Sequence, residues 1–150
     1  EATAYGALAI IDRIESYGVP VREIVNCGGL AVKNPLLMQI YADVTGRPMK
    51  VSTSEQTPAL GAAIFAAVSA GKAHGGYDGV TEAQRAMTST GKDYLPDNRN
   101  HQTYKELYDL YKQMHDAFGT PEWSGKMFNV MKDLLNIRDR VRQEKLCSKN

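Results

Sequence analysis

Residues 26–46 read NCGGLAVKNPLLMQIYADVTG, and this stretch decides the fold. A short apolar run stops at the pair Gly28-Gly29, as a buried parallel strand does where it ends at a loop. Asn34 and Pro35 then form the N-cap and first-turn pair that is typical of a helix start. The stretch therefore predicts a strand, a glycine loop and a helix in direct succession.

The residues that follow extend this pattern to a βαβ unit. Within the predicted helix, apolar residues recur at the spacing of one helix face, at Leu37, Ile40, Tyr41 and Val44. Gly46 and Pro48 end that helix, and residues 49–52 read as a second strand. We expect residues 23–27 and 49–52 to be parallel strands joined by a right-handed crossover.

Helical patterns flank the βαβ unit on both sides. Upstream, an amphipathic stripe precedes Gly18, a glycine that can take the left-handed cap of a helix. Downstream, Thr57 and Pro58 start a helix rich in alanine and glycine, which Gly71 closes. Small side chains let a helix approach a sheet closely, so we expect this helix to be buried.

The C-terminal part of the chain is predicted to be a helical pair. A polar, glycine-rich loop spans residues 72–79, and two long amphipathic stripes lie on either side of a break at residues 119–125. We expect the aromatic and methionine faces of both helices to turn inward.

Two strands are too few for an independent sheet, since sheets usually have about four to six. The chain also starts at Glu1 rather than at a methionine, with a helical pattern already running. We therefore expect the remaining strands to lie upstream, in a longer protein.

The glycine pair is the feature that points to chemistry. Glycines at a strand end let backbone N–H groups approach a ligand at the carboxyl edge of a parallel sheet. The same pair also serves as a tight turn without a ligand, and the bare pattern favours neither reading. Its spacing matches neither the dinucleotide fingerprint nor the phosphate-binding loop Gly-x-x-x-x-Gly-Lys-Ser/Thr.

Several stretches in this order resemble the FGGY carbohydrate kinases. Residues 26–46 resemble the family segment in which a strand ending in Gly-Gly leads into a helix with Met-Gln and Asp. Residues 57–71, TPALGAAIFAAVSAG, resemble the alanine-glycine helix that follows, and residues 1–10, EATAYGALAI, the helix that precedes the pair. HDAFG at 115–119 and FNVMKDL at 128–134 resemble the tail of family members that act on L-ribulose.

The resemblance implies an α/β fold of the actin-like ATPase class, with ribonuclease-H-like domains and ATP in the cleft between them. Residues 1–90 would be the C-terminal part of the nucleotide-binding domain, and residues 91–150 a helical tail packed on it. The implied enzyme uses ATP and Mg²⁺ to phosphorylate a sugar hydroxyl, here converting L-ribulose to L-ribulose 5-phosphate.

The resemblance also implies site residues. By position, Gly28, Gly29 and Leu30 would approach the nucleotide with backbone atoms, and Lys33 and Asn34 would lie near its adenosine end. In this family the aspartate that takes the sugar proton and the sugar-contacting residues precede this region. We therefore expect no catalytic residue in this chain, and no activity from the chain alone.

Composition argues against several other classes. Lys and Arg total 18 against 17 Asp and Glu, so a net charge of +1 gives no global field toward nucleic acid or an anionic membrane. The longest apolar run, residues 59–70, falls well short of the ~20 residues that cross a bilayer. Two unrelated cysteines and three scattered histidines give neither a disulfide framework nor a metal site, so we expect a cytoplasmic protein without its own metal ligands.

Two alternatives to a sugar kinase stay open at this point. One is a non-catalytic nucleotide-binding module of the same actin-like class, which the upstream sequence would separate from a kinase. The other is an interaction module that uses the two tail helices. A homo-oligomeric parent is also compatible with the sequence.

The near-neutral charge predicts negligible binding to DNA of arbitrary sequence. A phosphate-contacting surface works by releasing many counterions, and a chain of net charge +1 lacks the charge for it. Fluorescence anisotropy with a labelled duplex should stay flat up to micromolar protein. Micromolar binding that weakens steeply between low and physiological salt would contradict this expectation.

Overall fold

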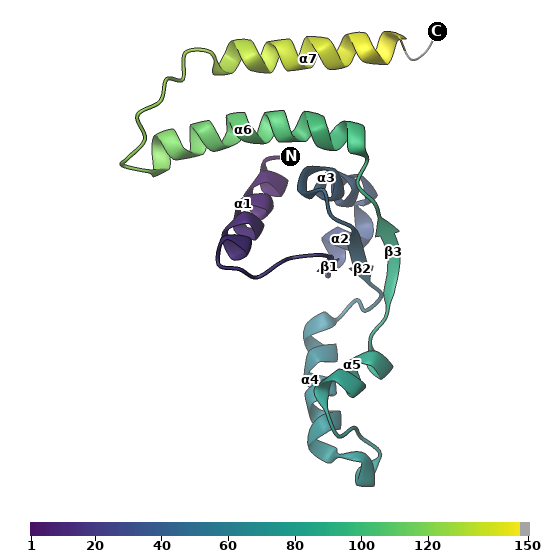
Figure 1. Cartoon of the computed structure of the whole chain (residues 1–150). Coiled ribbons are helices and arrows are strands. Elements are labelled where there is room, and N and C mark those ends of the chain that lie inside the picture. Colours follow the sequence, from purple (N-terminus) through teal and green to yellow (C-terminus); the bar gives the residue numbers. More distant parts are fainter. Residues whose placement is uncertain (148–150) are drawn as a thin grey trace.

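A three-stranded sheet lies at the centre of the chain, and α2 and α3 cover one of its faces (Figure 1). The computed structural model describes residues 1–147. Its elements are α1 Ala2–Ser16, β1 Ile24–Asn26, α2 Gly29–Lys33, α3 Pro35–Thr45, β2 Met49–Ser52, α4 Thr57–Ala70, the 3-10 turn η1 Lys72–His74, α5 Val80–Met87, β3 Thr90–Tyr94, α6 Asn98–Gly119 and α7 Val130–Cys147. In Figure 1, α6 and α7 run side by side across one end of the molecule, and α4 and α5 project from the other.

The sheet confirms the predicted βαβ unit and adds a strand to it. β1 and β2 are parallel, with Ile24 opposite Met49. β3 pairs antiparallel with β2, so that Tyr94 lies on the other side of Met49. β3 was not predicted from the sequence, because four of its five residues are exposed and only Tyr94 is buried.

α3 is the helix around which both cores form. Its sheet-facing side belongs to a core made of Ala31, Met38, Ala42, Met49, Val51 and Tyr94. A second core joins α3 to α1 and consists of Ala4, Tyr5, Leu8 and Val44. Tyrosines of α6 pack on this second core, at Tyr104, Tyr108 and Tyr111, which confirms the predicted inward tyrosine face of that helix.

The carboxylate of Asp43 joins α3 to the start of α6. Asp43 is 3% exposed, and its Oδ1 accepts hydrogen bonds from Gln39 Nε2 and from the backbone N–H of Asp97, both at 2.8 Å. Its Oδ2 accepts from Asn100 Nδ2 at 3.0 Å. Gln39 Nε2 also donates to the carbonyl of Leu95 at 2.8 Å. The carboxylate thus fixes the connection between β3 and α6, at a helix N-terminus that favours negative charge.

Two helix caps complete this junction. Asp97 caps α6 by accepting the N–H of Asn100 at 2.9 Å. Gly46 ends α3 in the left-handed conformation (φ 64°), as predicted. The ring of His101 lies directly over Gly46, where an added Cβ would stand 2.7 Å from its Cε1. His101 Nδ1–H donates to the carbonyl of Asp43 at 2.7 Å, so the glycine lets α6 approach the end of α3.

Three predicted burials are wrong. Val25 is 54% exposed and Cys27 is exposed, because none of the described helices packs closely on β1, whose main contacts are with β2. In α4 only Ile64 is buried, because this helix packs mainly on α5 and leaves its other faces uncovered. Phe118 and Met131 are also exposed, so the inward faces predicted for the tail helices are covered only in part.

None of the described helices, from α1 to α7, is long and apolar enough to cross a bilayer.

We predict that Asp43→Asn lowers the free energy of unfolding by about 3 kcal/mol, because it turns one oxygen into a donor that faces other buried donors. Urea unfolding followed by circular dichroism measures this loss. Asp78→Asn is the matched control, because Asp78 is exposed and its contacts with Lys72, to Nζ at 3.3 Å and to the backbone N–H at 3.4 Å, lie at the surface. Equal unfolding midpoints for the two variants would show that the buried network does not stabilise the fold.

Candidate functional site

The glycine turn follows β1 directly at the carboxyl edge of the two parallel strands. Gly28 has φ 88° and ψ 168°, a conformation that L side chains rarely adopt. Gly29 lies outside this region and begins α2. In the described part of the chain, no atom comes within 4 Å of a Cβ added at either glycine. Gly28 is therefore required by its backbone angles, while the space above both glycines is open.

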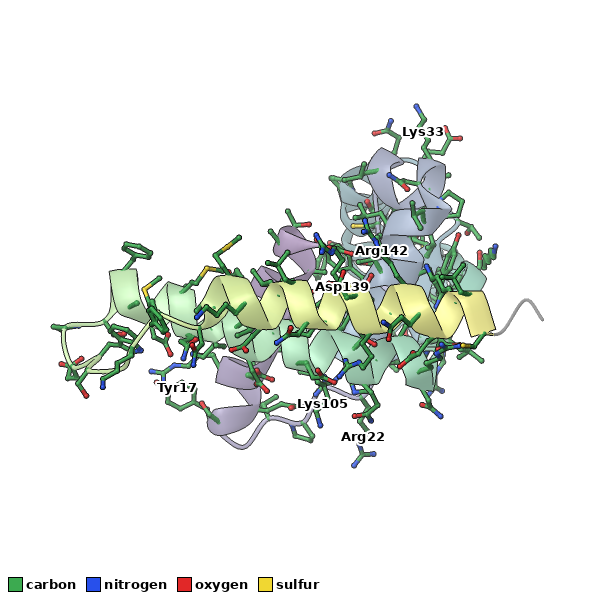
Figure 2. The ribbon with its side chains drawn as sticks, turned by 90° about the horizontal axis from the view of Figure 1, so that it is seen from above. Tyr17, Arg22, Lys33, Lys105, Asp139 and Arg142 are labelled. Atoms are coloured by element: carbon green, nitrogen blue, oxygen red, sulfur yellow. The ribbon has the colours of Figure 1, made fainter. Side chains whose placement is uncertain are left out.

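The other predicted site residues lie in the same short segment. Leu30 is 67% exposed on α2, and Lys33 at the end of α2 points outward from the molecule (Figure 2). Asn34 has a structural task, since its Oδ1 accepts the N–H of Leu37 at 3.0 Å and caps α3. All five predicted residues thus lie on α2 or next to it. Gly28, Gly29 and Leu30 are at the N-terminal end of this helix, and Lys33 and Asn34 are at its C-terminal end.

A hollow of about 380 Å³ opens between α2, the helix that follows this turn, and the sheet. Its walls come from α2, the start of α3, the end of β2 with the loop after it, and β3, and consist of Ala31, Val32, Pro35, Val51, Ser52, Thr53, Glu55, Gly91, Lys92 and Tyr94. This size falls in the range of small-molecule sites, about 300–1,000 Å³. The β3 residues of this hollow were not predicted from the sequence. The one feature of that polar segment that indicates a strand is the aromatic Tyr94.

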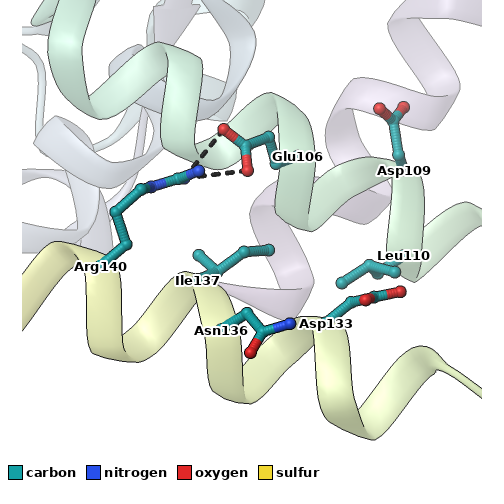
Figure 3. Close-up of a pocket in the computed structure, with 7 residues that line it drawn as sticks. All are labelled: Glu106, Asp109, Leu110, Asp133, Asn136, Ile137 and Arg140. Carbon is teal, nitrogen blue, oxygen red and sulfur yellow. Dashed lines mark hydrogen bonds and ion pairs between the residues drawn. The ribbon is translucent and has the colours of Figure 1, made fainter.

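A second hollow lies between α6 and α7, and Figure 3 shows its lining. Arg140 Nη2 donates to both carboxylate oxygens of Glu106 at 2.9 Å. Asp109 and Asp133 add two further negative charges to the walls. Because its one arginine is already paired with a carboxylate, this hollow offers little attraction to an anionic ligand. The Arg140–Glu106 pair instead links α7 to α6.

The tyrosine cluster between α1 and α6 is not an acid–base site. Burial raises the pKa of Tyr104 to about 12, with the nearby Glu1 carboxylate as a further cause. Burial likewise raises the pKa of Tyr5 and of Tyr108, whose hydroxyl donates to Asp12 Oδ2 at 2.8 Å. These hydroxyls stay protonated at neutral pH. Those of Tyr104 and Tyr108 donate hydrogen bonds to carboxylates, whereas the buried Tyr5 hydroxyl has no hydrogen-bond partner among the described residues and serves packing alone.

Residues 1–147 contain no group of three or more His, Cys, Asp or Glu side chains placed to bind one ion. The candidate site consists of the glycine turn, with its open backbone, and the hollow along α2.

Solved structures share the arrangement of these elements. The xylulose kinase from Rhodospirillum rubrum has a TM-score of 0.64 at 23% sequence identity, over 77% of this chain and 22% of that one. The gluconate kinase from Lactobacillus acidophilus has a TM-score of 0.53 at 21% identity, over 60% of this chain and 17% of that one. These likenesses show that the chain has the fold of one part of such kinases.

Sequence similarity is closer and covers nearly the whole chain. The ribulokinase of Anoxybacillus flavithermus is 47% identical over 146 residues, which is 97% of this chain and 25% of that protein. The ribulokinase of Halalkalibacterium halodurans is 50% identical over 141 residues, 93% of this chain and 25% of that protein. The chain thus spans about a quarter of the length of these curated relatives.

A family-level match covers the part of the chain that carries the glycine turn. Residues 1–70 match the sequence model of the FGGY family of carbohydrate kinases, C-terminal domain. The matched residues run from α1 through the turn and both parallel strands to the end of α4. Together with the ribulokinase relatives, this match shows that the chain belongs to the FGGY family of carbohydrate kinases.

Proposed function

We propose that the full-length parent of this chain is a cytoplasmic, ATP-dependent sugar kinase. It transfers the γ-phosphoryl group of ATP to a hydroxyl of L-ribulose and releases ADP and L-ribulose 5-phosphate. The choice of sugar rests on the ribulokinase relatives and on the tail of the chain. The alignments with those relatives cover 93–97% of the whole chain.

The observation that carries the proposal is the exposed glycine turn at the carboxyl edge of β1 and β2. Open α/β sheets bind their ligands at this edge, outside the ends of parallel strands. Gly28 and Gly29 leave open space above the backbone, and the hollow lies along α2, the helix that begins at Gly29. A nucleotide therefore has both a close backbone approach and an adjoining cavity.

The residues of this chain have a binding and orienting role in the reaction. Backbone atoms of Gly28, Gly29 and Leu30 hold the nucleotide, and Lys33 and Asn34 lie toward its adenosine end. Phosphoryl transfer depends mainly on the positions of the attacking and leaving oxygens and on charge stabilisation around them. The chain contributes one wall of that arrangement.

The remaining machinery comes from outside this chain. When bound, Mg²⁺ neutralises charge on the phosphates, but residues 1–147 offer no cluster of ligands that fits a metal ion. The buried carboxylate of Asp43 is not a base for the sugar, because it is engaged by Gln39, Asp97 and Asn100. The sugar site, the base and the Mg²⁺ ligands therefore belong to the rest of the parent.

Gly29→Val in the full-length parent should weaken ATP binding strongly, by about a hundredfold or more, because a branched side chain blocks the close backbone approach. The fold should tolerate the change, since Gly29 is not in the left-handed region and its Cβ meets no atom within 4 Å. Calorimetric titration with ATP measures the loss, and titration with L-ribulose checks the fold.

Gly79→Val is the matched control for this test. Gly79 also has open space around its Cβ and an extended backbone (φ −159°), and it lies at the start of α5. ATP affinity should be unchanged in this variant. If a folded Gly29→Val parent bound ATP as tightly as Gly79→Val does, the glycine turn would not be the nucleotide site.

The chain of residues 1–150 alone should show no sugar kinase activity, because it lacks the base and the opposite wall of the cleft. The assay follows ADP release with L-ribulose, xylulose and glycerol, and compares the chain with the full-length parent at equal concentration. The parent should turn over L-ribulose fastest. Turnover by the chain alone at a rate near the parent's would place the catalytic base within these 150 residues.

A further inference from the structure

Lys92 lines the hollow between α2 and the sheet. β3 runs antiparallel to β2, so its first residues stand beside the last residues of β2, with Thr90 opposite Ser52. The start of β3 therefore reaches the same sheet edge at which β1 leads into Gly28. Lys92 and Val32 of α2 line the same hollow, which places a lysine opposite the helix that begins at Gly29.

The ammonium group of Lys92 has no carboxylate partner among the described residues. Its Nζ stands 4.8 Å from the centroid of the Tyr94 ring, a contact that orients the cation without using its three hydrogen-bond donors. By contrast, Lys50 on the opposite face of the same sheet pairs with Glu23 at 2.9 Å. The charge of Lys92 is thus available to an anion.

We propose that Lys92 contacts the phosphate chain of the nucleotide that binds at the glycine turn. This inference rests on the proposed function, since it takes ATP as the ligand of the turn. A lysine ammonium binds phosphate as a point charge, and charge-assisted hydrogen bonds are among the strong ones. Lys92 lies beyond residues 1–70, which match the family model, so this contact belongs to the part of the chain outside that match.

The hollow also contains a carboxylate, which allows the effect of a negative charge on nucleotide binding to be compared with that of the positive charge of Lys92. Glu55 lines the same cavity as Lys92, but the two side chains do not form an ion pair in the part of the chain that the structure describes. If the hollow acts on the nucleotide through charge, removing the negative charge of Glu55 must have the opposite effect to removing the positive charge of Lys92.

The experiment measures ATP affinity of full-length parent variants by calorimetry. Lys92→Met keeps the apolar stem and should weaken ATP binding about tenfold, while Lys92→Arg restores it to within about twofold. Glu55→Gln should strengthen ATP binding about twofold. Lys50→Met is the matched control and should leave ATP affinity unchanged, because its charge lies on the other sheet face.

Gly29→Val, measured in the same experiment, distinguishes a failure of the Lys92 contact from a failure of the proposed nucleotide site. If Gly29→Val loses ATP binding but Lys92→Met does not, Lys92 has no contact with the nucleotide and the inference is wrong while the proposed function stands. If Gly29→Val binds ATP normally, the proposed site itself fails. A loss in Lys92→Met that Lys92→Arg does not restore, or that Glu55→Gln reproduces, would also overturn the role of charge. L-Ribulose titrations confirm that each variant is folded.

Discussion

The burial of the Asp43 carboxylate is the constraint on which the rest of this structure depends. An ionised carboxylate removed from water is strongly unfavourable unless donors surround it. Here two of the three donors, the N–H of Asp97 and the amide of Asn100, come from a segment more than 50 residues away in the sequence. α3 and the start of α6 must therefore take their places together, which ties the helical tail to the sheet domain.

The same helix connects this junction to the proposed nucleotide site. α3 begins at the Asn34 cap, directly after the glycine turn and α2, and ends at Gly46 beneath His101. One side of α3 packs on the sheet core and the other on α1 and the tyrosines of α6. The turn itself is free of such packing, so the well-packed helix α3 follows an open segment that is the proposed nucleotide site.

Local signals allowed the central unit to be predicted from sequence. Strand 49–52, the Asn34 cap, the Gly46 cap and the parallel pairing depend on neighbouring residues and backbone chemistry, and all are confirmed. β3 could not be predicted, because its polar residues have no strand pattern and its partner β2 lies about 40 residues earlier. The glycine pair was identifiable as a candidate site, but the wall that β3 adds to the hollow depends on tertiary pairing.

Exposed apolar side chains on α4 affect how the isolated chain behaves in solution. Phe65 is 65% exposed on a helix that projects from the sheet together with α5 (Figure 1). Burying such an apolar surface is favourable, whether it packs against a second copy of the chain or against another apolar surface. Preparations of the chain alone will therefore be prone to self-association as they are concentrated. Light scattering should accompany any measurement of their stability, since a concentration-dependent melting temperature would report association as well as unfolding.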